Sequence, residues 1–255
     1  GSYGEWEKKF EQLGTMLPTP NSYRTASGAP GIDYWQQRAD YKIDVTINDE
    51  NQTLYGEEEI TYYNNSPDVL RYLWVQLDQN VRSNESNTPL VTPSRMSKTF
   101  SGKRLQSLTN SYTNIKGEKY DGGFKIEYVR DIEGNDLDHS VISTMMRIDL
   151  NKPMLKGDSY SFKIKWSYEI NDRMKIGGRG GYEYFPKDNN FSYTIAQWFP
   201  RMAVYDDKEG WQNKQFLGRG EFALAFGDYE LNITVPADFI VAATGDLQNP
   251  KEVLT

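Results

Sequence analysis

The sequence contains no cysteine and a single histidine, His139, among its 255 residues. Structural zinc sites are usually built from four cysteine and histidine side chains, and catalytic zinc sites mostly use two or three histidines. These common zinc sites therefore cannot be assembled from this chain alone. The same deficit excludes disulfides and cysteine nucleophiles, and it leaves His139 as the only imidazole for a catalytic triad.

The sequence also lacks a basic cluster and a long apolar run. The 29 Lys and Arg residues are outnumbered by 36 Asp and Glu residues, which gives a net charge of −7. Because nucleic-acid affinity comes from neutralised phosphates, nucleic acid is not an expected partner. Apolar runs such as residues 239–244 are far shorter than the ~20 residues of a membrane helix, so no transmembrane segment is expected. No signal-peptide pattern opens the chain, but Gly1-Ser2 resembles a cloning remnant, which leaves localisation open.

An apolar pattern with a period of two dominates the sequence from residue 34 onward. In the clearest stretch, residues 160–170, apolar and polar side chains alternate without a break, which is typical of a strand with one buried face. The sequence predicts further strands at 43–47, 54–63, 73–77, 124–128, 142–150, 191–199, 221–226, 229–235 and 239–243. We therefore predict an all-β chain that forms an antiparallel saddle or β-sandwich of about ten strands.

Residues 1–33 are predicted to form a leader that precedes a β-domain at 34–255. Apolar residues at helical spacing predict a short amphipathic helix over residues 5–17. The Ser, Thr, Ala, Gly and Pro residues that follow, up to Gly31, are typical of a linker or a draped loop. Within the β-domain, residues 80–112 are polar and weakly periodic, so we expect a partly irregular excursion there.

Three sequence features could carry chemistry, and each has a simpler structural interpretation. The glycines at 177–181 could cradle a phosphate, but the Lys-Ser/Thr pair and helix of a P-loop are missing, so a flexible β-connection is expected. The carboxylates Asp206, Asp207 and Glu209 could form a hydrolytic pair or bind calcium, although such residues beside Gly210 usually form turns. His139 is expected to be a solvated histidine in a polar loop before a strand.

Aromatic residues make up 14% of the chain, which could indicate platforms for stacking sugars. Most of them occupy the apolar positions of the predicted strands, where aromatic side chains belong to the core. Only Tyr182, Tyr184, Trp198 and Trp211 lie in less regular contexts. A glycan- or protein-binding module at a cell surface therefore remains an alternative function.

One segment, YTIAQWFPRMAVYDD at residues 193–207, leads to a more specific hypothesis. With the blocks at 218–222 and 227–236, it resembles the N-terminal β-domain of the aminopeptidase N-type zinc metallopeptidases, the gluzincins. The early blocks at 41–47 and 55–62 are similar to the opening hairpin of that domain. The resemblance covers roughly residues 34–245 and keeps the blocks in order.

The resemblance implies a saddle-shaped β-domain that precedes a thermolysin-like catalytic domain and lines part of its cleft. The chain contains no His-Glu-x-x-His helix, no glutamate ligand after it and no Gly-x-Met-Glu-Asn strand. We therefore expect no catalytic residue and no metal ligand in this segment, which would end just before the catalytic domain. Zinc would belong to the parent protein, a peptidase that removes N-terminal residues from peptides. The expected partners are the parent's own C-terminal catalytic domain and a peptide substrate.

The resemblance also implies roles for individual residues. Gln197 matches a position that reaches into the cleft near the first side chain and the free amine of the substrate. From their spacing, Arg201 and either Asp206 or Asp207 are predicted to form a structural ion pair or to lock a turn. A third hypothesis keeps the family fold but gives the parent a degenerate, non-catalytic partner domain.

Overall fold

The computed structural model describes residues 20–88, 99, 101–102, 112–218, 220 and 223–254. The described part is mostly β, as the alternating pattern predicts. The predicted helix at 5–17 and the first two residues of the predicted strand at 221–226 lie outside the described residues. Among the residues that are described, no helix is long and apolar enough to cross a membrane.

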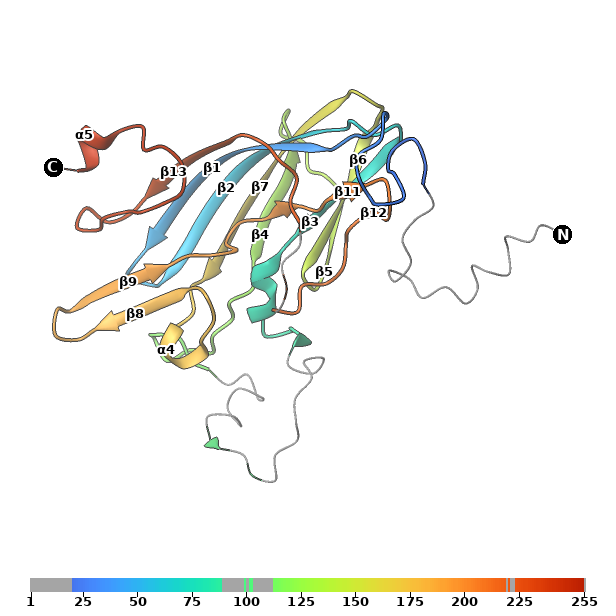
Figure 1. Cartoon of the computed structure of the whole chain (residues 1–255). Helices are drawn as coiled ribbons and strands as arrows, with labels where there is room; N and C mark the ends of the chain where they lie inside the picture. The colour runs from blue at the N-terminus through green and yellow to red at the C-terminus, as the bar shows by residue number, and fades with distance from the viewer. Residues whose placement is uncertain are drawn as a thin grey trace.

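The larger sheet has five strands in the order β13-β1-β2-β7-β4 (Figure 1). The strands are β1 (Arg38–Asn48), β2 (Thr53–Tyr63), β4 (Lys125–Asp131), β7 (Ser159–Glu169) and β13 (Tyr229–Thr234). The predicted hairpin of β1 and β2 and the predicted long strand β7 are confirmed, and all their mutual pairings are antiparallel.

The edge strand β13 departs from the prediction because it pairs with β1 in parallel, with Tyr229 opposite Tyr41. The backbone of Gly227 lies so close to the carbonyl oxygen of Ala39 that an added Cβ would overlap it. The strand predicted at 239–243 does not form, and Ile240 is 85% exposed. Residues 239–243 do not pair with a neighbouring strand in the described part of the chain, and an apolar run alone does not provide such a partner.

The smaller sheet has the order β10-β3-β6-β5 and comprises β3 (Leu70–Gln76), β5 (His139–Ile142), β6 (Met145–Met154) and β10 (Arg201–Met202). The strand predicted at 142–150 is confirmed from Met145 onward as part of β6, but its predicted start is wrong, because Ile142 belongs to β5 and the chain reverses between β5 and β6.

Two residues account for this reversal. Ser143 has a φ of +51°, which an extended strand does not allow. Thr144 is buried, and both its N–H and its hydroxyl donate to Gln215 Oε1, at 2.8 and 2.7 Å. As a consequence, His139 is the exposed first residue of β5 rather than a loop residue.

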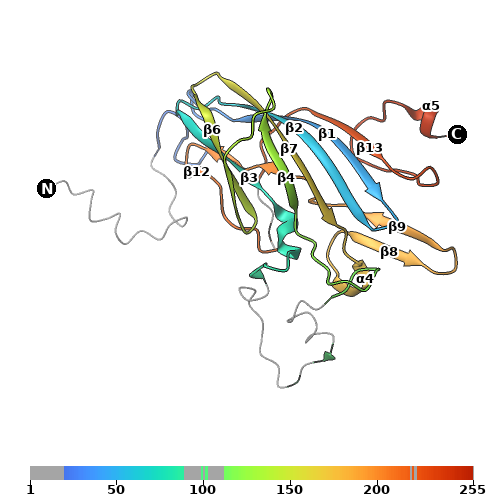
Figure 2. The same ribbon diagram turned by 180° about the vertical axis from the view of Figure 1, so that it is seen from behind.

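Two small hairpins complete the described strands, β8 (Gly181–Phe185) with β9 (Asn190–Thr194) and β11 (Tyr205–Asp206) with β12 (Gly210–Trp211). The β8–β9 hairpin projects past the end of the large sheet (Figure 2). The strand predicted at 191–199 therefore stops early, at Thr194. Helical pieces that lie wholly within the described residues include η2 (Asp78–Arg82), α4 (Arg173–Ile176) and α5 (Pro250–Val253).

One hydrophobic core joins the inner faces of the two sheets. From β7 it takes Phe162, Ile164, Trp166 and Tyr168, which alternate with outward-facing lysines and serines. The smaller sheet contributes Leu73, Val75, Met146 and Ile148. Because the side-chain period of a strand is two, this alternation fixes the register of β7.

Candidate functional site

The candidate site centres on residues 195–200, which connect β9 to β10. Gln197 has a φ of +55°, a left-handed conformation that residues other than glycine adopt rarely. Its side chain is half-buried, and no hydrogen bond of its amide is found among the residues that the structure describes. Strained backbone of this kind is often found at functional positions, so Gln197 is a candidate on geometry as well as on resemblance.

Aromatic packing holds this connection on the core. The ring of Trp198 lies 6.0 Å from Trp166 and 4.8 Å from Phe199. Phe199 in turn meets Tyr41 edge-on at 5.7 Å, and Tyr41 stacks on Tyr229 at 4.8 Å. The segment with Gln197 is therefore held by aromatic side chains of β7, β1 and the edge strand β13.

An ion pair between Arg201 and Asp78 fixes the far end of the same connection. Both side chains are largely withdrawn from water, at 15% and 2% exposed. Burial raises the pKa of Asp78, and the guanidinium of Arg201 opposes that rise. Asp78 is the first residue of η2, so the ion pair ties residues 195–201 to η2.

This ion pair corrects the prediction that Arg201 pairs with Asp206 or Asp207. Asp207 instead accepts two bonds from Arg24 Nε, both at 2.9 Å. Asp206 accepts the backbone N–H groups of Lys208 and Glu209 within the β11–β12 turn, at 3.1 and 2.8 Å. Asp206 therefore stabilises the β11–β12 turn, and Asp207 holds the N-terminal loop through Arg24. No ion pair of either aspartate with Arg201 is found among the described residues.

Polar groups that the sequence did not single out lie buried beneath this segment. Glu58 is 1% exposed on the inner face of β2, neither of its carboxylate oxygens has a hydrogen bond, and burial raises its pKa well above the ordinary value. Gln76, opposite Arg201 in the sheet, is buried with both amide atoms unpartnered. The hydroxyl of Tyr41 accepts the N–H of Met202 at 2.9 Å and lies within electrostatic reach of both Glu58 and Arg201.

A sequence signal existed for some of these buried groups, because Tyr41 and Glu58 each continue the inward-facing alternation of their strand. Glu58 continues the alternation of Leu54, Gly56, Ile60 and Tyr62, so its position in the strand already indicates the inner face. Asp78 follows a strand and carries no comparable pattern, because its partner is 123 residues away.

The aromatic residues in irregular contexts prove to be mostly packed. Tyr182 is 5% exposed, and Trp211 lies 5.8 Å from Tyr62 and 5.1 Å from Tyr205. Only Tyr184, at 47% exposed, presents much of its ring to solvent. A flat aromatic platform for sugars is therefore not supported by Trp198 or Trp211.

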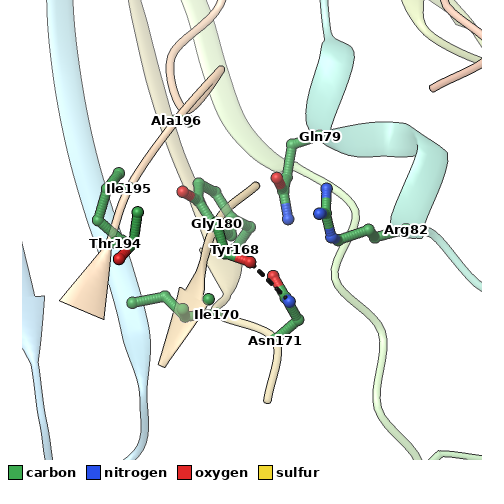
Figure 3. Close-up of a pocket in the computed structure, with 10 residues that line it drawn as sticks. Gln79, Arg82, Tyr168, Ile170, Asn171, Gly180, Thr194, Ile195 and Ala196 are labelled. Atoms are coloured by element: carbon green, nitrogen blue, oxygen red, sulfur yellow. Dashed lines mark hydrogen bonds between the residues drawn. The ribbon is translucent and has the colours of Figure 1, made fainter. Parts of the chain in front are cut away.

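The glycines at 177–181 connect α4 to β8, and a small cavity lies beside them (Figure 3). The cavity is enclosed by η2 on one side and by residues 194–196 on the other. Ala196 lines this cavity and directly precedes Gln197 in the sequence. Within the described ranges, no group of three His, Cys, Asp or Glu side chains could hold a metal ion.

No protein-family model and no curated protein matches this chain. Similar solved structures include the M1 zinc metallopeptidase from Deinococcus radiodurans, at 10% identity and a TM-score of 0.37, covering 82% of this chain and 34% of that one. A mutant of that enzyme bound to a Tyr-Ser-Ala substrate is 12% identical, with a TM-score of 0.42 and coverages of 85% and 36%. The chain therefore spans about a third of the length of the structures it matches.

Proposed function

We propose that this chain is the non-catalytic N-terminal β-domain of a zinc metallo-aminopeptidase and that it lines the substrate cleft of its own C-terminal catalytic domain. The observation that carries the proposal is residues 193–207, the segment with the most specific sequence resemblance. In the fold, the Arg201–Asp78 ion pair anchors this segment, and Gln197 within it has a left-handed backbone conformation.

Gln197 would bind the peptide substrate in this proposal. A neutral amide offers both a donor and an acceptor, so it can hydrogen-bond the backbone or the free amine of a peptide without taking part in proton transfer. The Arg201–Asp78 ion pair and the packing of Trp198 would position it, since a side chain orients a ligand only when its own backbone is fixed.

The residues of this chain do not fit a zinc site, so the zinc of the proposed peptidase belongs to the catalytic domain. His139 is the only histidine, and its Nδ1 lies 3.0 Å from the carbonyl oxygen of Leu137 on an exposed edge strand. Catalytic zinc needs three protein ligands around one open position, and His139 has no companions of that kind in the described part of the chain.

The proposal is tested by assaying the purified chain with aminoacyl chromogenic substrates, with added zinc and with a chelator. We expect no release of chromophore above the buffer rate in either condition. Turnover that survives the chelator and is lost in a variant of this chain would overturn the proposal, because a non-catalytic domain has no reacting group to lose.

A further inference from the structure

Two side chains of η2, Gln79 and Arg82, point into the cavity beside residues 177–181 (Figure 3). Gln79 is 4% exposed, and its Nε2 has no hydrogen-bond partner. Arg82 is half-buried, and its guanidinium makes no ion pair or side-chain hydrogen bond with any residue that the structure describes. A buried donor without an acceptor is costly, so Gln79 Nε2, at the same cavity as the guanidinium of Arg82, calls for an acceptor from outside the described residues.

The loop at residues 177–180 brings its backbone close to these donors. Asn171 Nδ2 donates to the carbonyl oxygens of Gly177 and Gly180, at 3.2 and 2.9 Å, and so folds the glycine loop over the cavity. A Cβ on Gly178 would overlap the Nη2 atom of Arg82, so only glycine lets the loop pack against the guanidinium. The donors and the loop thus form one built feature.

The cavity measures about 10 Å³, which is room for one water molecule or one oxygen atom of a larger group. The cavity is not fully enclosed. A ligand would therefore insert a single atom and keep the rest of its body outside. That atom must be an acceptor, because Gln79 Nε2 and the guanidinium only donate.

We propose that Gln79, Arg82 and the loop at Gly178 form a binding site for a carboxylate group, which inserts one oxygen into the cavity. Arginine and amide donors are the usual partners of a carboxylate, and the charge-assisted bond to Arg82 would supply most of the affinity. The carboxylate could belong to a small free anion or to the C-terminus of a peptide. This inference does not rest on the proposed aminopeptidase function.

Two carboxylates of the same region are already engaged and do not fill this role. Asp121 pairs with Lys125 and accepts the N–H of Asn84 at 3.1 Å. Glu169 accepts the N–H of Asp121 at 3.5 Å. No bond from either carboxylate to Arg82 is found among the described residues, so these two groups do not occupy the proposed site.

The test titrates the chain with sodium acetate at constant ionic strength and follows both the heat of binding and the unfolding temperature. We expect a saturable rise in the unfolding temperature. Arg82→Gln and Gln79→Glu should each weaken acetate binding by more than about tenfold, because each removes a donor to a charged group. The control Arg173→Gln removes a neighbouring cation that already pairs with Glu183, and it should leave binding unchanged.

Two glycine substitutions make the same comparison without replacing either donor side chain. Gly178→Ala pushes Arg82 aside, whereas Gly177→Ala, at a similar positive φ, meets no atom within 4 Å. Both should cost stability, but only Gly178→Ala should weaken acetate binding.

The source of the carboxylate is resolved with N-acetyl-diglycine and its C-terminal amide. Tighter binding of the acid than of acetate assigns the site to peptide C-termini, and equal binding assigns it to small anions. Acetate heats and temperature shifts that are identical in the parent chain and in Arg82→Gln would show that the cavity holds only water. Equal binding of the acid and the amide would likewise overturn the proposal.

Discussion

Glu58 is the residue whose chemistry departs most from that of its surroundings, since it places an unpartnered carboxyl in an apolar core. Its pKa is raised by burial above the ordinary value of 4.5, so the folded state holds the proton more tightly than the unfolded state does. The stability that this proton contributes is therefore complete at low pH, and it is lost as the pH rises from about 4.5 through the folded pKa.

Glu58→Gln cannot lose a proton and should escape this loss. The free energy of unfolding of the variant, relative to the parent chain, should increase by about 1.4 kcal/mol per pH unit within that window. Urea denaturation at several pH values measures it. Two parallel pH profiles would mean that Glu58 titrates alike in the folded and unfolded states.

Gly56 makes a second prediction at the level of single residues. A Cβ at this position would overlap the six-membered ring of Trp166, which is 2% exposed. Gly56→Ala should therefore lower the free energy of unfolding by about 1 to 3 kcal/mol, as overpacking in a core does. In a Trp166→Phe background the same substitution should cost less, because phenylalanine lacks the atoms that clash. An equal cost in both backgrounds would show that the destabilisation does not come from contact with Trp166.

At the level of elements, the sequence predicts strands whose evidence is local. Strand β7 was predictable because its inner and outer faces alternate through eleven residues. The turn at Ser143 and Thr144 was not, since it depends on Gln215, which comes 71 residues after Thr144. The parallel pairing of β13 was hidden for the same reason, and the apolar run at 239–243 shows that hydrophobicity without a partner strand does not make a strand.

The attachment of β13 depends on the contact between Gly227 and Ala39. Gly227→Ala would push the two backbones apart, while Ala39 N–H donates to the carbonyl oxygen of Phe226 at 3.0 Å. We expect the backbone amides of β13 to exchange with deuterium at least tenfold faster in this variant, with β2 and β7 unchanged. Thr234→Ala, at the exposed end of β13, is the control. Unchanged exchange in β13 would contradict the contact.

The candidate site was predictable only in part, for the same physical reason. Gln197 could be named from a resemblance in one continuous segment. The ion pair of Arg201 could not be assigned, because three acidic residues were available and the closest in sequence were not the closest in space. The donors Gln79 and Arg82 carried no pattern at all, since only the fold brings them to the glycine loop.

On the scale of the whole molecule, the predicted boundary at residue 33 separates segments that are in contact. Arg24 pairs with Asp207, which is 6% exposed, and the guanidinium of Arg24 lies 5.0 Å from the ring centroid of Tyr34. Arg24→Ala would leave a buried carboxylate unpaired and should lower the free energy of unfolding by about 1 to 3 kcal/mol. Arg38→Ala, which breaks an exposed ion pair, should change it much less. Equal effects would mean that residues 20–33 form an independent leader.

We propose that this chain is a domain of a zinc peptidase and that it holds no zinc of its own. The most direct measurement is the amount of zinc bound per chain after equilibrium dialysis against micromolar zinc, determined by mass spectrometry. The account predicts well below one zinc per chain, and the same value for His139→Ala. One tightly bound zinc per chain that is lost in His139→Ala would contradict it.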